Sequence, residues 1–189
     1  GHPEWHIQED VLTILNPKKQ SIPGDDWYGF KFRTTDGILH CIEGKWDLMV
    51  AHPPCTYLAV SGAKWYYHPE DKDLPIEQRR PHPKFPNRAQ DRAEAEAFFL
   101  ALANADIEHI AIENPVGIMN SRFRKPDQVV QPYFFGDAAS KSTCLWLKNL
   151  PLLTPTKMVD KGEYIEFKSG KRIPKWYSDG LTKTKTAEE

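Results

Sequence analysis

Short apolar runs that stop abruptly at proline or charge are the main pattern along this chain. The clearest is Leu48–Ala51, which is followed at once by His52, Pro53, Pro54 and Cys55. A run of this length is typical of a buried strand, and two consecutive prolines indicate its end because they lack the amide donors of a sheet ladder. We therefore expect a strand that delivers Cys55 to its carboxyl end.

A longer stretch, residues 88–104, shows helical periodicity instead. Its apolar residues recur at positions i, i+3, i+4 and i+7, which is the spacing of one buried helix face. These residues are Ala95, Phe98, Phe99 and Leu102. Glutamate and arginine side chains occupy the opposite face, and Asn87 stands where a helix cap is favoured. The pattern predicts an amphipathic helix that packs through its apolar stripe.

A second short apolar run, residues 109–112, ends in Glu113, Asn114 and Pro115. Strand, helix and strand in this order form a βαβ unit, whose two strands are parallel and end at the same rim. The unit predicts that Cys55 and Glu113 lie close together although they are far apart in the sequence. Since ligands bind just beyond the carboxyl ends of parallel strands, a thiol and a carboxylate are expected at one crevice.

Further elements are expected on either side of this unit. Residues 28–33 and 37–42 flank an Asp-Gly pair and predict a hairpin. Residues 164–167 and 171–173 flank a Ser-Gly pair and predict a second, smaller hairpin. The same patterning predicts strands at residues 6–12, 129–135 and 142–147.

Residues 66–87, between Cys55 and the predicted helix, are rich in proline and charge. Irregular loops of this length inside a compact domain are usually functional or mobile. Because the segment follows the candidate nucleophile so closely, we expect it to be mobile or to close over the site as a lid.

Composition narrows the class of protein. A chain of 189 residues with 40% hydrophobic and 12% aromatic content fits one globular α/β domain covering residues 1–189. No apolar stretch approaches the roughly 18 residues of a membrane span, and three scattered cysteines do not resemble a disulfide framework, so a cytoplasmic setting is expected.

The net charge of −1 does not favour nucleic-acid binding by the molecule as a whole. Contacts to phosphate would have to come from local basic clusters. Two clusters are candidates, although an ordinary solvated surface is the favoured interpretation of each. They are Arg122, Arg124 and Lys125, and Lys168, Lys171 and Arg172.

Four motifs, in their order along the chain, resemble those of cytosine-5 DNA methyltransferases, and in particular a compact phage and prophage branch of that family. They are HPPCTYLAVSG, IENPVGIM, DQVVQPYFFG and KSTCLWLKNLP. The resemblance runs from Ile7 to Thr156. It implies a Rossmann-like methyltransferase fold with a mostly parallel central sheet. It also implies methyl transfer from S-adenosylmethionine to carbon 5 of cytosine in DNA.

The two residues at the strand ends suit this chemistry. Carbon 5 of cytosine is a poor nucleophile until a group adds at carbon 6, and a thiolate such as Cys55 can add there and leave again. A carboxyl group such as Glu113, held at the Watson–Crick edge, can bond the ring nitrogen and the amino group and stabilise the developing charge. A base inside a duplex cannot reach such a crevice, so base flipping is implied.

The resemblance also suggests roles for other residues. The expected substrate-binding residues are Pro54, Asn114, Pro115, Lys141 and Thr143. Lys141 and Thr143 occupy the place of the family's arginine-containing motif, although the residues differ here. Asp10 occupies the place of an acidic residue that contacts the adenine of the cofactor. No metal ligand is expected.

The chain begins after the family's first strand and glycine-rich turn, which hold the methionine part of the cofactor. The resemblance therefore implies that residues 1–189 are part of a larger catalytic domain. The sizeable target-recognition domain of larger relatives has no counterpart, so the target sequence stays open. The alternative is a methyltransferase-fold protein that binds nucleic acid without catalysis.

Two other enzyme classes fit less well. A zinc nucleobase deaminase combines H-x-E with P-C-x-x-C, whereas no second cysteine follows Cys55 at that spacing. An amino-group methyltransferase also ends a strand in Pro-Pro, but an aromatic residue follows and no thiol is needed. Cys41 and Cys144 are expected to have no catalytic role.

Overall fold

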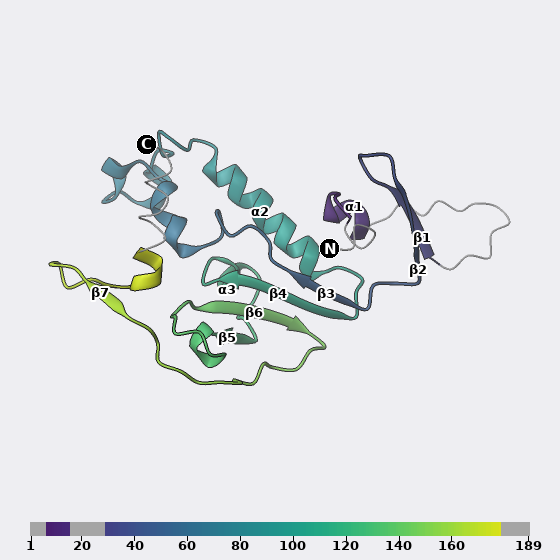
Figure 1. Ribbon diagram of the computed structural model, residues 1–189. Coiled ribbons are helices and arrows are strands. Elements are labelled where there is room, and N and C mark those ends of the chain that lie inside the picture. Colours follow the sequence, from purple (N-terminus) through teal and green to yellow (C-terminus); the bar gives the residue numbers. More distant parts are fainter. Residues whose placement is uncertain (1–6, 16–28, 179–189) are drawn as a thin grey trace.

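The computed structural model describes residues 7–15 and 29–178 and is a mixed α/β arrangement (Figure 1). A four-stranded sheet with the order β3-β4-β6-β5 lies at its centre. The strands of this sheet are β3 (Leu48–Ala51), β4 (His109–Pro115), β5 (Gln128–Val130) and β6 (Thr143–Lys148). Helix α2 (Arg88–Ala103) connects β3 to β4 and packs on one face of the sheet. Among the described residues, no helix has both the length and the apolar character needed to cross a membrane.

The predicted βαβ unit is confirmed. Strand β3 pairs with β4 in parallel, from Leu48 opposite His109 to Ala51 opposite Ile112. The rest of the sheet differs from the mostly parallel arrangement that was expected, because β4–β6 and β5–β6 are antiparallel pairs. A parallel return requires a crossover, usually a helix that packs across the sheet. Between β4 and β6 the chain forms only the four-residue helix α3 (Met119–Arg122), short strand β5 and a 3-10 turn, so β6 enters from the opposite end.

The hydrophobic core lies between α2 and the sheet. Its buried members are Leu58, Phe99, Leu102, Ile107, Ile110, Ile112, Met119, Cys144 and Trp146. The predicted stripe on α2 is confirmed, since Ala95 and Phe98 pack against this cluster beside Phe99 and Leu102. Asn87 precedes the helix, but its side chain makes no capping hydrogen bond. Burial raises the pKa of the Cys144 thiol, which therefore behaves as a small apolar side chain.

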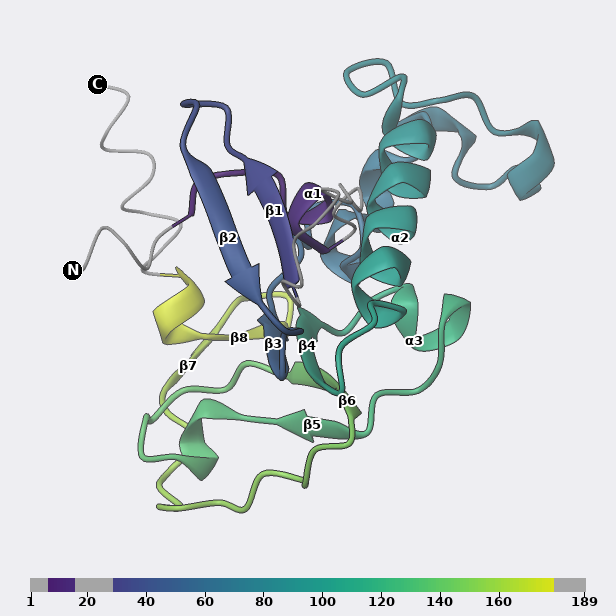
Figure 2. The ribbon, with the colours of Figure 1, turned by 90° about the vertical axis from the view of Figure 1, so that its right-hand side faces the viewer.

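Both predicted hairpins are present. Strands β1 (Gly29–Arg33) and β2 (Leu39–Glu43) form the first, and β7 (Tyr164–Glu166) and β8 (Arg172–Pro174) form the second. Figure 2 shows α2 and the β7–β8 hairpin on opposite sides of β3 and β4. The strand predicted at residues 129–135 is shorter than expected. It is β5, which ends at Val130, and Pro132 starts a 3-10 turn soon after.

The strand predicted at residues 6–12 is wrong over its described part, since Val11–Leu15 forms helix α1. The helix forms for a local reason. An Asp10 carboxylate oxygen accepts a hydrogen bond from the Leu12 amide at 2.9 Å, which caps the first turn. Val11 and Leu15 then pack against the core. His6 lies outside the described residues.

The insertion at residues 66–87 is an internally bonded unit, and the expectation that it is mobile or closes over the site as a lid stays a prediction. Tyr67 and Pro81 form a bridge between its two ends. The buried Asp71 carboxylate accepts bonds from the Arg80 amide at 2.8 Å and from its guanidinium at 2.7 Å. His82 is also buried, with its ring edge-on to Trp65 at 5.2 Å.

This Asp71–Arg80 pair predicts a pH dependence confined to the insertion. The Arg80 guanidinium and amide lower the pKa of Asp71 from 3.8 to about 2. Because the folded pKa is below the unfolded one, the stabilisation is complete above pH 3.8 and is lost as the pH falls towards 2. In Asp71→Asn we expect the backbone amides of residues 67–82 to exchange faster than in wild type at neutral pH. Wild type should lose protection of these amides as the pH falls towards 2, whereas the variant should lose no more.

Hydrogen exchange, corrected for the intrinsic effect of pH on the rate, provides the measurement. Asp73→Asn is the matched control, since Asp73 lies exposed in the same insertion. Equal protection in wild type and Asp71→Asn at neutral pH would contradict the proposed role of the pair.

Candidate functional site

The parallel register of β3 and β4 brings the two predicted motif segments to one rim of the sheet. The pairing ends with Ala51 opposite Ile112, so the chain leaves both strands at the same level. Two side-chain contacts then join the segments. The His52 Nδ1 atom lies 3.1 Å from Glu113 Oε2, and the Asn114 side-chain amide donates to the Pro53 carbonyl at 2.8 Å.

Glu113 extends from the sheet face opposite α2. Along β4, Ile110, Ile112 and Asn114 are buried, and the two isoleucines belong to the core under α2. Because successive side chains of a strand alternate between faces, Glu113 points the other way. Its side chain is 25% exposed, which leaves the carboxylate accessible but partly enclosed.

Cys55 has an exposed side chain on a tightly fixed backbone. It is a free thiol, and its carbonyl accepts hydrogen bonds from the amides of Leu58 at 3.0 Å and Ala59 at 2.9 Å. Leu58 is 2% exposed and anchors this turn in the core. Pro53 is buried under the turn, whereas Pro54 is exposed beside Cys55. The thiol is therefore accessible while its backbone is held in place.

The turn after Cys55 also crosses the segment that follows β4. Ala59 forms a bridge with Gly117, and the Ile118 amide donates to the Leu58 carbonyl at 2.9 Å. A β-carbon on Gly117 would collide with that same carbonyl, so the close approach requires glycine. The glycine of IENPVG thus fixes how near the two motif segments come.

Two further predicted substrate residues belong to the antiparallel strand β6 and the segment before it. Thr143 pairs directly with Pro115, and the register places it on the same sheet face as Glu113. Its hydroxyl donates to the Lys141 carbonyl at 3.3 Å. Lys141 is exposed, and within the described residues no hydrogen bond or ion pair joins its side chain to Glu113 or Cys55.

Asp10, the predicted cofactor residue, belongs to a different part of the molecule. Beside it, Glu9 accepts a hydrogen bond from the Thr35 amide at 2.7 Å, which ties this segment to the β1–β2 turn. Figure 1 shows α1 beyond the C-terminal end of α2, whereas the short helices that follow Cys55 lie near its N-terminal end. In the described part of the chain, no hydrogen bond or ion pair joins Asp10 to Cys55 or Glu113.

The described residues do not form a complete site for S-adenosylmethionine. One oxygen of the exposed Asp10 carboxylate already caps α1, which leaves the other as a single acceptor. Within residues 7–15 and 29–178, no glycine-rich turn follows a strand at the rim to hold the methionine part. In the same ranges no group of three or more His, Cys, Asp or Glu side chains is arranged to hold a metal ion.

The two basic clusters differ in whether their side chains make contacts within the fold. Arg124 pairs with Asp127 at 2.8 Å and donates to the Leu147 carbonyl at 3.1 Å, so it braces the sheet. Lys168 and Lys171 are exposed at the β7–β8 turn, while Arg172 lies 3.9 Å from Glu166.

The sequence pattern alone does not single out His52, Gly117 or Arg88. His52 and Gly117 join the two motif segments, and Arg88 contacts the one that follows β3. Only their positions in the sequence could have indicated these residues. His52 precedes Pro-Pro, Gly117 is the last residue of IENPVG, and Arg88 starts the predicted helix. Comparison with protein-family models, with curated proteins and with solved structures found no match to this chain.

Proposed function

We propose that this chain carries the catalytic residues of a DNA (cytosine-5) methyltransferase, with Cys55 as the nucleophile and Glu113 as the group at the Watson–Crick edge. The observation that supports this most is the parallel pairing that ends at Ala51 and Ile112, with Cys55 exposed after one strand and Glu113 accessible on the next. The resemblance of four motifs to that family supplies the reaction class.

In the proposed addition step, the Cys55 thiolate forms a bond to carbon 6 of a flipped cytosine. The electron pair of the C5–C6 double bond shifts towards carbon 5 and the ring nitrogen, where a protonated Glu113 donates a hydrogen bond. Carbon 5 thereby becomes nucleophilic and takes up one electrophile, which is a solvent proton in the exchange reaction and would be a methyl group when a donor is bound. Loss of the original hydrogen of carbon 5 as a proton, together with departure of the thiolate, then restores the aromatic ring.

The methyl donor is proposed from the resemblance to be S-adenosylmethionine, which supplies an electrophilic methyl group when bound. Because the described residues form no complete site for it, the steps assigned to this chain are those of the thiol and the carboxyl group. Lys141, Thr143, Pro54, Asn114 and Pro115 are proposed to surround the base.

His52 is proposed to orient the Glu113 carboxyl group. With a proton on Nδ1 the imidazole donates to Oε2, which leaves Oε1 directed at the base. We expect His52→Phe to lower the rate of cytosine C5 hydrogen exchange by about tenfold with little change in KM for DNA, and His52→Gln to restore part of it. Glu113→Gln should lower the rate by about 100-fold.

The control for this series is His109→Phe, at the opposite end of β4, where the imidazole faces the Asp47 carbonyl at 3.2 Å. The exchange rate of that variant should match wild type. If His52→Phe and His109→Phe have equal rates, the orienting role of His52 is wrong.

The identity of the product tests the proposed function. The full-length protein is incubated with labelled S-adenosylmethionine and a pool of random-sequence duplexes, and the DNA is digested to nucleosides. We expect 5-methyldeoxycytidine. N4-methyldeoxycytidine would show an amino-group methyltransferase instead. DNA binding without any methyl transfer would favour the alternative, a catalytically incomplete protein that binds nucleic acid.

A further inference from the structure

Arg88 is a buried arginine that contacts the backbone of the candidate nucleophile. It is the first residue of α2 and only 6% exposed. Its Nη2 donates to the carbonyl of Thr56, the residue directly after Cys55, at 2.9 Å. Buried arginines are normally paired with a carboxylate. No described carboxylate pairs with Arg88, and its Nε–H is buried with no hydrogen-bond partner.

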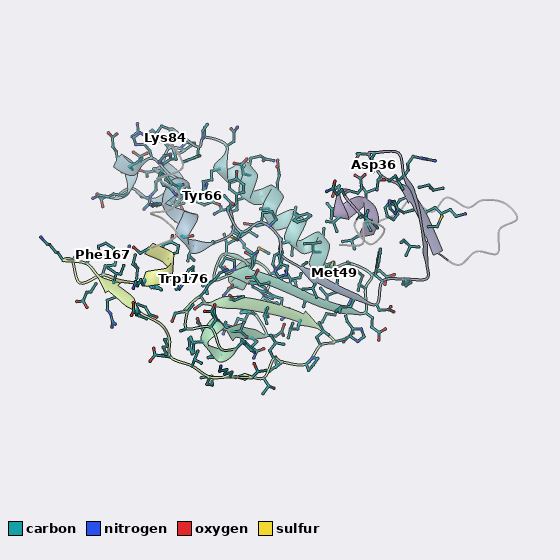
Figure 3. All side chains as sticks on the ribbon, in the orientation of Figure 1. Asp36, Met49, Tyr66, Lys84, Phe167 and Trp176 are labelled. Atoms are coloured by element: carbon teal, nitrogen blue, oxygen red, sulfur yellow. The ribbon has the colours of Figure 1, made fainter. Side chains whose placement is uncertain are left out.

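Aromatic rings enclose the guanidinium instead. Its central carbon lies 5.1 Å from the ring centre of Tyr57 and 5.2 Å from that of Tyr66, with Phe85 at 5.8 Å. Figure 3 shows Tyr66 beside the N-terminal end of α2. Cation–π contacts with these rings restrict where the guanidinium can lie. The insertion therefore supplies part of the enclosure that directs Arg88 to the Thr56 carbonyl.

Gly62 keeps the space that this contact needs. A β-carbon at position 62 would lie 2.5 Å from Arg88 Nη2 and 3.1 Å from the Thr56 oxygen. Any larger residue would push the guanidinium away from the carbonyl. The glycine of VSG and the arginine that starts α2 are thus matched to one hydrogen bond.

We propose that Arg88 is a positioning residue for Cys55, an inference that rests on the proposed function. Backbone groups on both sides of Cys55 are fixed by bonds from elsewhere in the fold. Asn114 holds the Pro53 carbonyl before it, and Arg88 holds the Thr56 carbonyl after it. The Cys55 carbonyl itself accepts two amides of the turn. With these three carbonyls fixed, the Cys55 backbone is held in place, so the thiol starts from one position when it approaches a base, as a near-attack geometry requires.

Arg92 provides a matched control on the same helix. Its guanidinium also stacks on Tyr66, at 4.4 Å, and it pairs with Glu96 at 3.5 Å. No hydrogen bond from the Arg92 side chain to the 55–62 turn is present in the described structure. Removing Arg92 therefore takes a second cation away from Tyr66 but leaves in place the rings around Arg88 and its bond to Thr56.

We expect Arg88→Met to lower kcat for cytosine C5 hydrogen exchange in DNA by about 100-fold while KM changes less than about twofold. Arg88→Lys keeps one donor and should recover part of kcat, and Arg92→Met should match wild type. Gly62→Ala should reproduce Arg88→Met, and the double variant should be no slower than either single one, because both remove the same hydrogen bond.

Hydrogen exchange of the Leu58 and Ala59 amides, which bond the Cys55 carbonyl, gives a readout independent of catalysis. We expect about tenfold faster amide exchange in Arg88→Met than in Arg92→Met. If wild type shows no catalysis but this difference is present, Arg88 still positions the turn and the proposed function is wrong. Unchanged amide protection, or equal kcat in Arg88→Met and Arg92→Met, would overturn the role of Arg88.

Discussion

Replacing Cys55 by serine is expected to lower the rate of cytosine C5 hydrogen exchange by about 1,000-fold or more, because a hydroxyl forms almost no anion near neutral pH, whereas free thiols are a few per cent thiolate and sulfur is intrinsically the better nucleophile. Exchange needs no methyl donor. Addition of the thiolate at carbon 6 lets carbon 5 take up a solvent proton, and loss of the original hydrogen with the thiolate completes the cycle. Mass spectrometry of DNA that carries deuterium at carbon 5 measures the rate.

Cys41→Ser is the control for this prediction, since Cys41 is an exposed free thiol in strand β2, outside the rim of the sheet. Its exchange rate should equal that of wild type. KM for DNA should be unchanged in Cys55→Ser, because serine is nearly isosteric with cysteine and the backbone bonds of the turn remain. An exchange rate in Cys55→Ser within about tenfold of wild type would contradict the role of the thiol.

Replacing Trp146 by alanine is expected to lower the free energy of unfolding by about 3–5 kcal/mol. Trp146 is 2% exposed, its ring packs edge-on against Phe99 at 5.1 Å, and its Nε1 donates to the Arg124 carbonyl at 2.9 Å. Alanine would leave a cavity between α2 and the sheet and an unpaired carbonyl. Trp146 also pairs in register with Ile112, the residue before Glu113, so loosening there would reach the site.

Urea unfolding of the variant and wild type measures this loss. Trp176→Ala is the matched control: Trp176 is 41% exposed, and we expect its loss to cost about 1 kcal/mol or less, through the bond from its Nε1 to the Ser140 carbonyl at 3.2 Å. A change below about 1 kcal/mol in Trp146→Ala would show that the sheet and α2 are not held together through this ring.

The parts of the fold that sequence predicts well are those set by local pattern. The stripe on α2 and the two hairpins follow from spacing within a few residues, and the parallel pair β3–β4 follows from the order strand, helix, strand. The same local pattern gave the wrong result at residues 6–12, where an Asp10 cap outweighs the alternation of a short segment.

Sheet direction and order in the insertion depend on distant contacts, which local pattern does not report. The run at 109–112 is apolar, yet along β4 buried residues alternate with half-buried ones because α2 covers only one face. Such a run does not reveal that β6 returns antiparallel. In the insertion, a charge-rich sequence is ordered by one buried carboxylate, Asp71, and its Arg80 partner.

The sequence predicts which residues stand at the strand ends of the candidate site, but not which residues hold them in place. Cys55 and Glu113 follow from where two apolar runs stop, and the register brings those ends together. His52 and Arg88 look like ordinary surface residues in the sequence, since only the fold places one against Glu113 and buries the other against Thr56.

Trapping with 5-fluorocytosine tests most directly whether Cys55 attacks the base. The full-length protein, a methyl donor and a pool of duplexes containing 5-fluorocytosine are combined, and the products are separated under denaturing conditions. Fluorine cannot leave as a proton does, so the adduct formed after methyl transfer persists. We predict a covalent complex whose digest carries the modified base on the Cys55 peptide, and no complex with Cys55→Ser. An adduct on another residue, or 5-methylcytosine made by Cys55→Ala, would contradict the mechanism.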